Sequence, residues 1–244
     1  MRKLLLLLIA LASIAFGVCS LASADSCTNA FGYQGIGTGC NSVIASGGGA
    51  RSYTYQGGQT SNVSGSTATF TAPLGTADPS RLVIVGLVIQ NNPTPLSMTC
   101  GATSLSQIAT DPSGGGTYIF AGNVTSGTSC TLTVTCTSCG SDDVDIAVWT
   151  ALNLTSNTAV HGTGGDCANV TFSVTAGDYW FAVGHTGGTT GNFSGSTQSP
   201  TAETIITGAN GVTMIPADMT IASTNASFSN AYSNCDKFSL ATWH

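Results

Sequence analysis

Hydrophobic residues in this chain form short runs, and one of these runs is typical of a strand buried on both faces. Residues 82–89 (Leu-Val-Ile-Val-Gly-Leu-Val-Ile) contain no polar side chain, and polar residues follow them together with Pro93 and Pro95. The run is too short for a buried helix or a membrane span, and its Val and Ile residues favour a pleated backbone. Because both faces of this strand are apolar, we expect both to be covered.

Similar runs along the rest of the chain predict short strands separated by turns such as Asp78-Pro79 and Asn92-Pro93. We expect strands at residues 66–72, 82–90, 96–100, 117–124, 130–136, 143–154, 169–174, 179–185, 203–207, 211–215 and 237–243. Residues 179–183 are also apolar on both sides, whereas residues 222–231 fit an edge strand, a loop or a short helix. The pattern predicts an all-β fold, an antiparallel two-sheet β-sandwich that is either immunoglobulin-like or a jelly roll.

Alternation within two of these strands indicates which face is buried. In residues 130–136, threonines alternate with Leu132, Val134 and two cysteines, so we expect the threonines to face water and the cysteines to point inward. In residues 143–149, Val144, Ile146 and Val148 fall on one side and predict a buried face.

The N-terminal sequence predicts export. Arg2 and Lys3 precede an apolar stretch, and the small residues Ala22-Ser23-Ala24 follow it, which is the pattern of a cleaved signal peptide. We therefore expect a signal peptide at residues 1–24, a glycine-rich arm at 25–58 and a β-sandwich domain at 59–244. The mature protein would be secreted, either extracellular or at the cell surface, with no stable membrane span.

Charge excludes one large class of partner. Beyond residue 24, three basic residues face eleven acidic ones, a net charge of −8. Such a chain has no basic patch for a phosphate backbone, so we expect no nucleic-acid binding.

Eight cysteines remain after the signal peptide, and an even number in an exported chain predicts disulfides. They are Cys27, Cys40, Cys100, Cys130, Cys136, Cys139, Cys167 and Cys235. The connectivity is open, although Cys27 and Cys40 bracket a short glycine-rich loop and form the best single candidate pair. The Cys-x-x-Cys at 136–139 follows a predicted strand rather than opening a helix, which favours a structural disulfide over a redox or zinc site.

Several of these runs together resemble a known kind of β-sandwich. Residues 78–85, 98–103, 116–120, 124–129 and 144–149 are similar to domains of bacteriophage tail and virion structural proteins and of uncharacterised exported bacterial proteins. Those domains have a D-R-L-V-V-V strand, a G-G-x hairpin, a V-x-x-G-T-S turn and an A-V-W/Y strand. The resemblance implies a structural or surface-display module without a known shared activity. The export signal and the cysteines depart from phage tail proteins and favour a cell-surface or extracellular role.

Candidate chemistry is sparse. Tyr53 and Tyr55 lie two residues apart in a polar segment, so they would share a strand face and could stack on a sugar. Asp142, Asp143 and Asp145 offer the oxygen ligands that calcium prefers, although the glycine and spacing of an EF-hand loop are absent. A hydrolase would have to use a histidine such as His185 with a nearby aspartate, and the chain has no G-x-S-x-G elbow.

These observations favour a non-enzymatic protein. We expect a structural, adhesive or self-assembling surface subunit, without a required cofactor, whose partners are further copies of itself or a surface glycan. The alternatives are a carbohydrate-binding module and a secreted hydrolase. If the glycine-rich arm added a strand to a neighbouring subunit, main-chain hydrogen bonds would join subunits into fibres.

Overall fold

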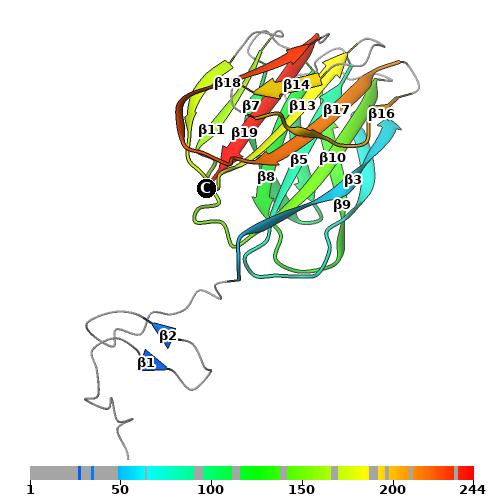
Figure 1. Ribbon diagram of the computed structural model, residues 1–244. Helices are drawn as coiled ribbons and strands as arrows, with labels where there is room; N and C mark the ends of the chain where they lie inside the picture. The colour runs from blue at the N-terminus through cyan, green and yellow to red at the C-terminus, as the bar shows by residue number, and fades with distance from the viewer. Residues whose placement is uncertain are drawn as a thin grey trace, which may run out of the picture. The chain divides into compact units, whose positions relative to one another are not determined.

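The computed structural model consists of antiparallel β-strands throughout its described residues, which confirms the predicted fold class (Figure 1). It describes residues 27–28, 34–35, 49–63, 65–90, 96–111, 116–137, 142–165, 170–186, 192–195, 198–208, 211–233 and 236–244. The chain divides into two units, residues 1–48 and residues 49–244. The first contains a short pair of strands, β1 (Cys27–Thr28) and β2 (Gln34–Gly35). Within the described segments, no helix has the length and apolar character needed to cross a membrane.

The second unit begins with an eight-stranded sheet that folds over on itself. Its order is β3 (Ser52–Asn62), β10 (Asp143–Leu152), β5 (Leu82–Ile89), β8 (Thr117–Asn123), β7 (Thr103–Thr110), β6 (Leu96–Cys100), β9 (Ser129–Cys136) and β4 (Thr67–Pro73). The sheet turns at β7, whose first residues pair with β6 and whose last residues pair with β8. The two edge strands β3 and β4 therefore come close together, and the Gln59 side chain donates a hydrogen bond to the Thr71 carbonyl (2.7 Å).

The first hydrophobic cluster fills the inside of this folded sheet. It receives alternate side chains from both halves, among them Val85 of β5, Phe120 of β8, Val148 of β10 and Leu132 of β9. As predicted, Leu132 and Val134 are buried, and the intervening threonines form the outer, hydrated face.

A six-stranded sheet packs against the outer side of β10, β5 and β8. Its main path is β11 (His161–Gly165), β19 (Lys237–Trp243), β13 (Tyr179–Thr186), β17 (Thr213–Thr220) and β15 (Thr201–Ala202), and β16 (Ile206–Thr207) also pairs with β17. The second cluster lies between the two sheets and includes Ile84, Trp149, Phe181 and Trp243. Strand β5 is therefore covered on both faces, as its sequence predicts.

A three-stranded sheet covers the other side of the six-stranded one. It has the order β12 (Val170–Val174), β18 (Asn225–Ser233) and β14 (Asn192–Gly195). The third cluster lies between these sheets and contains Trp180, Phe193 and Phe228. The body is thus a stack of four β-layers around three hydrophobic clusters, which adds two layers to the sandwich expected from the sequence.

Two segments have roles that differ from the expectation. Residues 52–58, which the sequence analysis placed in the arm, form the first part of β3 and pair with β10. Of residues 222–231, for which three alternatives were open, 225–231 belong to β18 (Asn225–Ser233), the central strand of the three-stranded sheet.

A disulfide joins Cys100 of β6 to Cys130 of β9, and Cys136 is disulfide-bonded as well. Cys136 points inward, as predicted, and Cys130 packs against the first cluster. The proposed partner of Cys27, Cys40, lies outside the described residues, as do Cys139, Cys167 and Cys235.

Candidate functional site

Tyr53 and Tyr55 face the space between the eight-stranded and six-stranded sheets because β3 contains a bulge. Val148 of β10 pairs with Gly57 and Trp149 pairs with Tyr55, so the residue between them has no partner across the ladder. Gly57 adopts a φ of 118°, which glycine tolerates and other residues rarely adopt. A bulge shifts the alternation of side chains by one residue. Both tyrosines therefore lie on the side of β3 that faces β17.

Neither tyrosine forms an isolated stacking platform. The Tyr53 ring packs edge-on against Tyr179 and Phe181, with centroid distances of 4.9 and 5.3 Å. The Tyr55 ring lies against Trp149 at 5.5 Å. Both side chains are half-buried, so they close the side of the second cluster and still reach the surface.

A pair of carboxyl groups meets these tyrosines. Asp218 lies on β17, and Glu203 follows β15 directly, where its backbone N–H donates to the Pro216 carbonyl (2.9 Å). The two side chains lie close enough for Asp218 to raise the pKa of Glu203. Asp218 also accepts a hydrogen bond on each oxygen, from the Tyr53 hydroxyl (3.0 Å) and from the Trp149 indole N–H (2.7 Å). The pair is therefore held in one orientation by groups from both sheets.

Burial and mutual repulsion keep this pair partly protonated. Burial, the hydrogen bond to Asp218 and the charge of Asp218 raise the pKa of Glu203 to about 7. Burial and the nearby carboxylates also raise the pKa of Tyr55 to about 12, and they raise the pKa of Tyr53 further. At neutral pH both tyrosine hydroxyls are thus neutral, and the Glu203 carboxyl group holds a proton part of the time.

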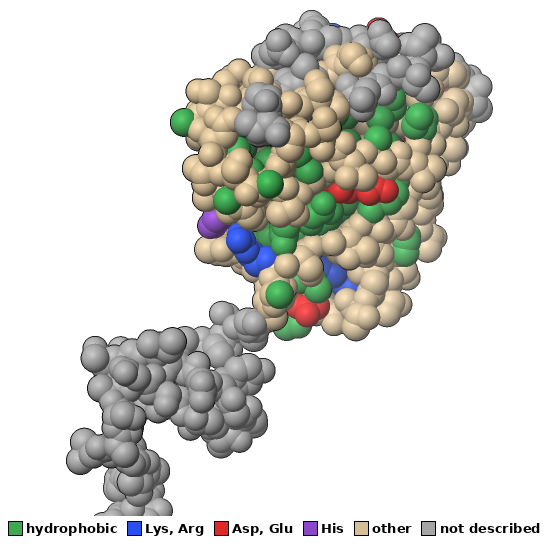
Figure 2. All heavy atoms as spheres, in the orientation of Figure 1, with side chains coloured by type: hydrophobic (Ala, Val, Ile, Leu, Met, Phe, Trp, Pro, Cys, Tyr) green, Lys and Arg blue, Asp and Glu red, His purple; other side chains and the backbone are tan. Residues whose placement is uncertain are grey.

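This cluster opens on the surface in a hollow. Figure 2 shows hydrophobic side chains along the hollow, acidic side chains at one end and a basic side chain at the other. Arg51, one residue before β3, is close enough to Tyr179 for its charge to lower the pKa of that tyrosine, although burial has the larger effect and raises it. We call the surface formed by Arg51, Tyr53, Tyr55, Glu203 and Asp218 the tyrosine–carboxyl hollow.

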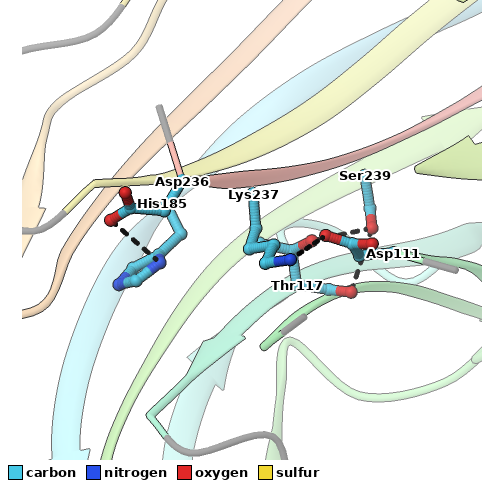
Figure 3. Close-up of polar contacts among 6 residues, drawn as sticks. All are labelled: Asp111, Thr117, His185, Asp236, Lys237 and Ser239. Carbon is cyan, nitrogen blue, oxygen red and sulfur yellow. Dashed lines mark hydrogen bonds and ion pairs between the residues drawn. The ribbon is translucent and has the colours of Figure 1, made fainter. Parts of the chain in front are cut away.

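The histidine considered for hydrolysis lies elsewhere, at the end of β13 (Figure 3). His185 Nδ1 is 3.9 Å from Asp236 Oδ2, too far for a hydrogen bond, and burial lowers the pKa of His185. The hydroxyl of Ser239, the serine shown in the same view, is fully buried and donates to the Thr117 carbonyl (2.9 Å). Nearby, Lys237 Nζ is 3.5 Å from Asp111 Oδ2 and links β19 to the end of β7. These contacts join the two larger sheets.

The aspartates considered for calcium are buried at the start of β10. Asp143 and Asp145 are fully buried and share the face of the strand that points toward the six-stranded sheet, and Asp142 precedes them. Acidic side chains are mostly exposed in proteins, so the burial of these aspartates is unusual. Among the residues described, no group of three or more His, Cys, Asp or Glu side chains could hold a metal. Calcium binding stays a prediction.

Comparison with models of known protein families gives no match, and neither does comparison with curated protein sequences.

Sequence reasoning found the tyrosines and missed the carboxyl pair. Glu203 drew attention only as the single glutamate, and Asp218 drew none. The signal for Asp218 is its place as the one charged residue in the apolar run of 213–219, which forms a buried strand. A carboxyl group in such a position must have partners, but the sequence does not indicate which ones.

Proposed function

We propose that this protein is an exported, non-enzymatic adhesive subunit of the cell surface or extracellular space, and that it binds a glycan in the tyrosine–carboxyl hollow. One observation carries this proposal: two tyrosines and a carboxyl pair, from segments far apart in the sequence, meet at one surface hollow. Carboxyl oxygens accept hydrogen bonds from sugar hydroxyls, and tyrosine faces pack against the C–H groups of a sugar ring.

The geometry of the carboxyl pair favours binding over hydrolysis. Glycosidases separate their two carboxyl groups so that a sugar or a water fits between them, whereas Asp218 lies close enough to Glu203 to raise its pKa. Both oxygens of Asp218 already accept hydrogen bonds from Tyr53 and Trp149, so neither is free to take a proton from an attacking water.

The character of the surface supports an extracellular, adhesive role. The outer face of β4 and β9 presents threonines at Thr67, Thr69, Thr71, Thr131 and Thr135. This face is uncharged and hydrated, and among the described residues only Val160 and Ile205 are large hydrophobic side chains that are exposed. Such a surface suits a protein that stays soluble outside the cell and recognises its ligand at a defined site.

A glycan array probed with the protein lacking residues 1–24 tests the proposal. We expect retention on one class of glycan, and we expect Glu203→Gln to weaken that retention about tenfold, because hydrogen bonds to a charged group are strong. Asp236→Asn is the matched control, since its side chain is 57% exposed and lies at the separate His185 site. Retention of no glycan would contradict the proposed function, and retention that Glu203→Gln leaves unchanged would contradict the assigned site.

A further inference from the structure

Arg51 is a cation without a partner in a chain that has few cations. Beyond residue 24 the basic residues are Arg51, Arg81 and Lys237. The Arg81 guanidinium donates to five backbone carbonyl groups at 2.7–3.1 Å. Lys237 pairs with Asp111. Arg51 makes no ion pair with any residue that the structure describes, and its Nη1 is shielded from solvent without a hydrogen-bond partner.

A shielded guanidinium nitrogen without an acceptor is costly, because the group loses its hydration and gains nothing in return. Arg51 lies beside Gly177, where a Cβ would be 2.8 Å from Arg51 Nη2. The next residue, Asp178, is an acid, but its carboxylate already has partners. Asp178 binds His244 Nδ1 at 2.6 Å and accepts the Thr175 backbone N–H at 2.7 Å. Arg51 is only partly buried, so an anionic ligand at its exposed part would supply the acceptor that the described residues do not.

Two tyrosines, Tyr179 and Tyr53, lie between Arg51 and Asp218. The charge of Arg51 acts on Tyr179, the Tyr179 ring contacts Tyr53, and the Tyr53 hydroxyl donates to Asp218. Figure 2 shows the same order across the hollow, with a basic side chain at one end, hydrophobic side chains between and acidic side chains at the other end. The ligand that fits this order has an anionic group at one end and hydrogen-bond donors at the other.

We propose that the glycan bound in the tyrosine–carboxyl hollow carries a carboxylate, as in a uronic acid, and that Arg51 binds this carboxylate; this inference rests on the proposed function. The planar guanidinium matches a carboxylate with two parallel hydrogen bonds. The hydroxyl groups at the other end of the sugar donate to Glu203, whose side chain is only partly buried, and the ring packs against Tyr53. A neutral sugar would leave Arg51 without a partner. An acidic peptide would satisfy Arg51, but it offers few donors to the carboxyl pair.

The test compares three probes by titration calorimetry with the protein lacking residues 1–24. The probes are a trimer of galacturonic acid, the neutral galactose trimer and a glutamate hexapeptide. We expect the uronic acid trimer to bind at least about tenfold more tightly than the neutral trimer, because a charge-assisted pair with Arg51 is lost in the latter. Arg51→Gln should remove this difference by weakening the binding of the uronic acid trimer. Arg51→Lys should restore part of it, since lysine keeps the charge without the bidentate geometry.

Other outcomes would overturn the inference. Equal binding of both trimers, equal loss of both in Arg51→Gln, or tighter binding of the peptide than of the uronic acid trimer would each do so. If neither trimer binds while the array retains a neutral glycan, the inference fails and the proposed function stands. If no glycan binds in either experiment, the proposed function fails as well. Urea unfolding of each variant shows whether a change in affinity reflects a change in folding.

Discussion

Arg81 and Asp145 are both fully buried, but only the charge of Arg81 is compensated by neighbouring groups. The Arg81 guanidinium donates to five carbonyl oxygens from the segments that follow β4 and β8, so its charge is compensated and ties these segments together. Neither carboxyl oxygen of Asp145 has a hydrogen-bond partner among the described residues, and the carboxyl group of Asp143 lies close by. Arg81 is therefore stable as an ion, whereas Asp145 favours its neutral form.

Asp145 should make the protein less stable as the pH rises. Burial, partly opposed by the nearby Thr60 hydroxyl and reinforced by the charge of Asp143, raises the pKa of Asp145 from 3.8 to about 7. Between these values the folded chain binds more protons than the unfolded chain, so the free energy of unfolding falls as the pH rises from about 4 to about 7. The loss is on the order of 3 kcal/mol. Glu203 contributes in the same direction.

Asp145→Asn should remove the larger part of this loss, because the amide stays neutral at every pH. Urea unfolding at pH 5 and pH 8 measures the effect, and the variant should gain more stability at pH 8 than at pH 5. The same change at the exposed Asp236 should leave the pH dependence as it is. An unaltered pH dependence in Asp145→Asn would show that Asp145 ionises normally in the folded protein.

Among the single strands, the ones that are apolar on both faces could be predicted from their composition. The runs at 82–89 and 179–183 became β5 and β13, and each is covered on both sides because its layer lies between two others. Strands with few apolar residues were missed. β7 has one small apolar stretch, and β11 (His-Gly-Thr-Gly-Gly) has almost none.

Glycines in these strands mark close packing that no propensity scale indicates. A Cβ on Gly162 would lie 2.3 Å from the Ile108 carbonyl oxygen, and one on Gly164 would lie 2.6 Å from the Thr110 carbonyl oxygen. Strand β11 therefore packs directly against the backbone of β7, and only glycine permits this. The sequence shows the glycines but not the strand that approaches them.

Gly86 sets the distance between the two larger sheets. A Cβ there would lie 2.2 Å from Val183 Cγ1 on β13, within the second cluster. We expect Gly86→Ala to lower the free energy of unfolding by about 1–3 kcal/mol, because overpacking a rigid core displaces its neighbours. Gly165→Ala is the matched control, since its Cβ would lie 3.6 Å from Phe238 in ordinary contact. Urea unfolding of the two variants compares them, and equal stabilities would show that the sheets adjust freely.

At the scale of the whole molecule, the sequence predicted the class of fold but not the number of layers. Alternation indicates that a face is buried, yet it does not indicate which sheet covers it. For the same reason the sequence could place Tyr53 and Tyr55 on one face of a strand but could not bring Glu203 and Asp218 to them. That contact depends on how the six-stranded sheet packs against β3, which is a property of the assembled body.

The body should fold without the first 48 residues. All three hydrophobic clusters, the Cys100–Cys130 disulfide and the tyrosine–carboxyl hollow lie within residues 49–244. A chain that begins at Gly49 should therefore unfold in one cooperative transition, with a midpoint within about 3 °C of that of the chain that begins at Asp25. Calorimetry of the two chains measures this. A broad transition or a much lower midpoint would mean that residues 25–48 stabilise the body.

The same two chains test the proposal that the glycine-rich arm joins subunits. If residues 25–48 add a strand to a neighbouring copy, the chain that begins at Asp25 should form larger, concentration-dependent species in sedimentation, and the chain that begins at Gly49 should be smaller. Because the shorter chain keeps the tyrosine–carboxyl hollow, its affinity for a single sugar ligand should be unchanged. Its retention on a dense glycan surface should fall, since several linked sites bind more tightly than one. Equal sizes for both chains would show that residues 25–48 do not join subunits. Each molecule would then bind through a single site.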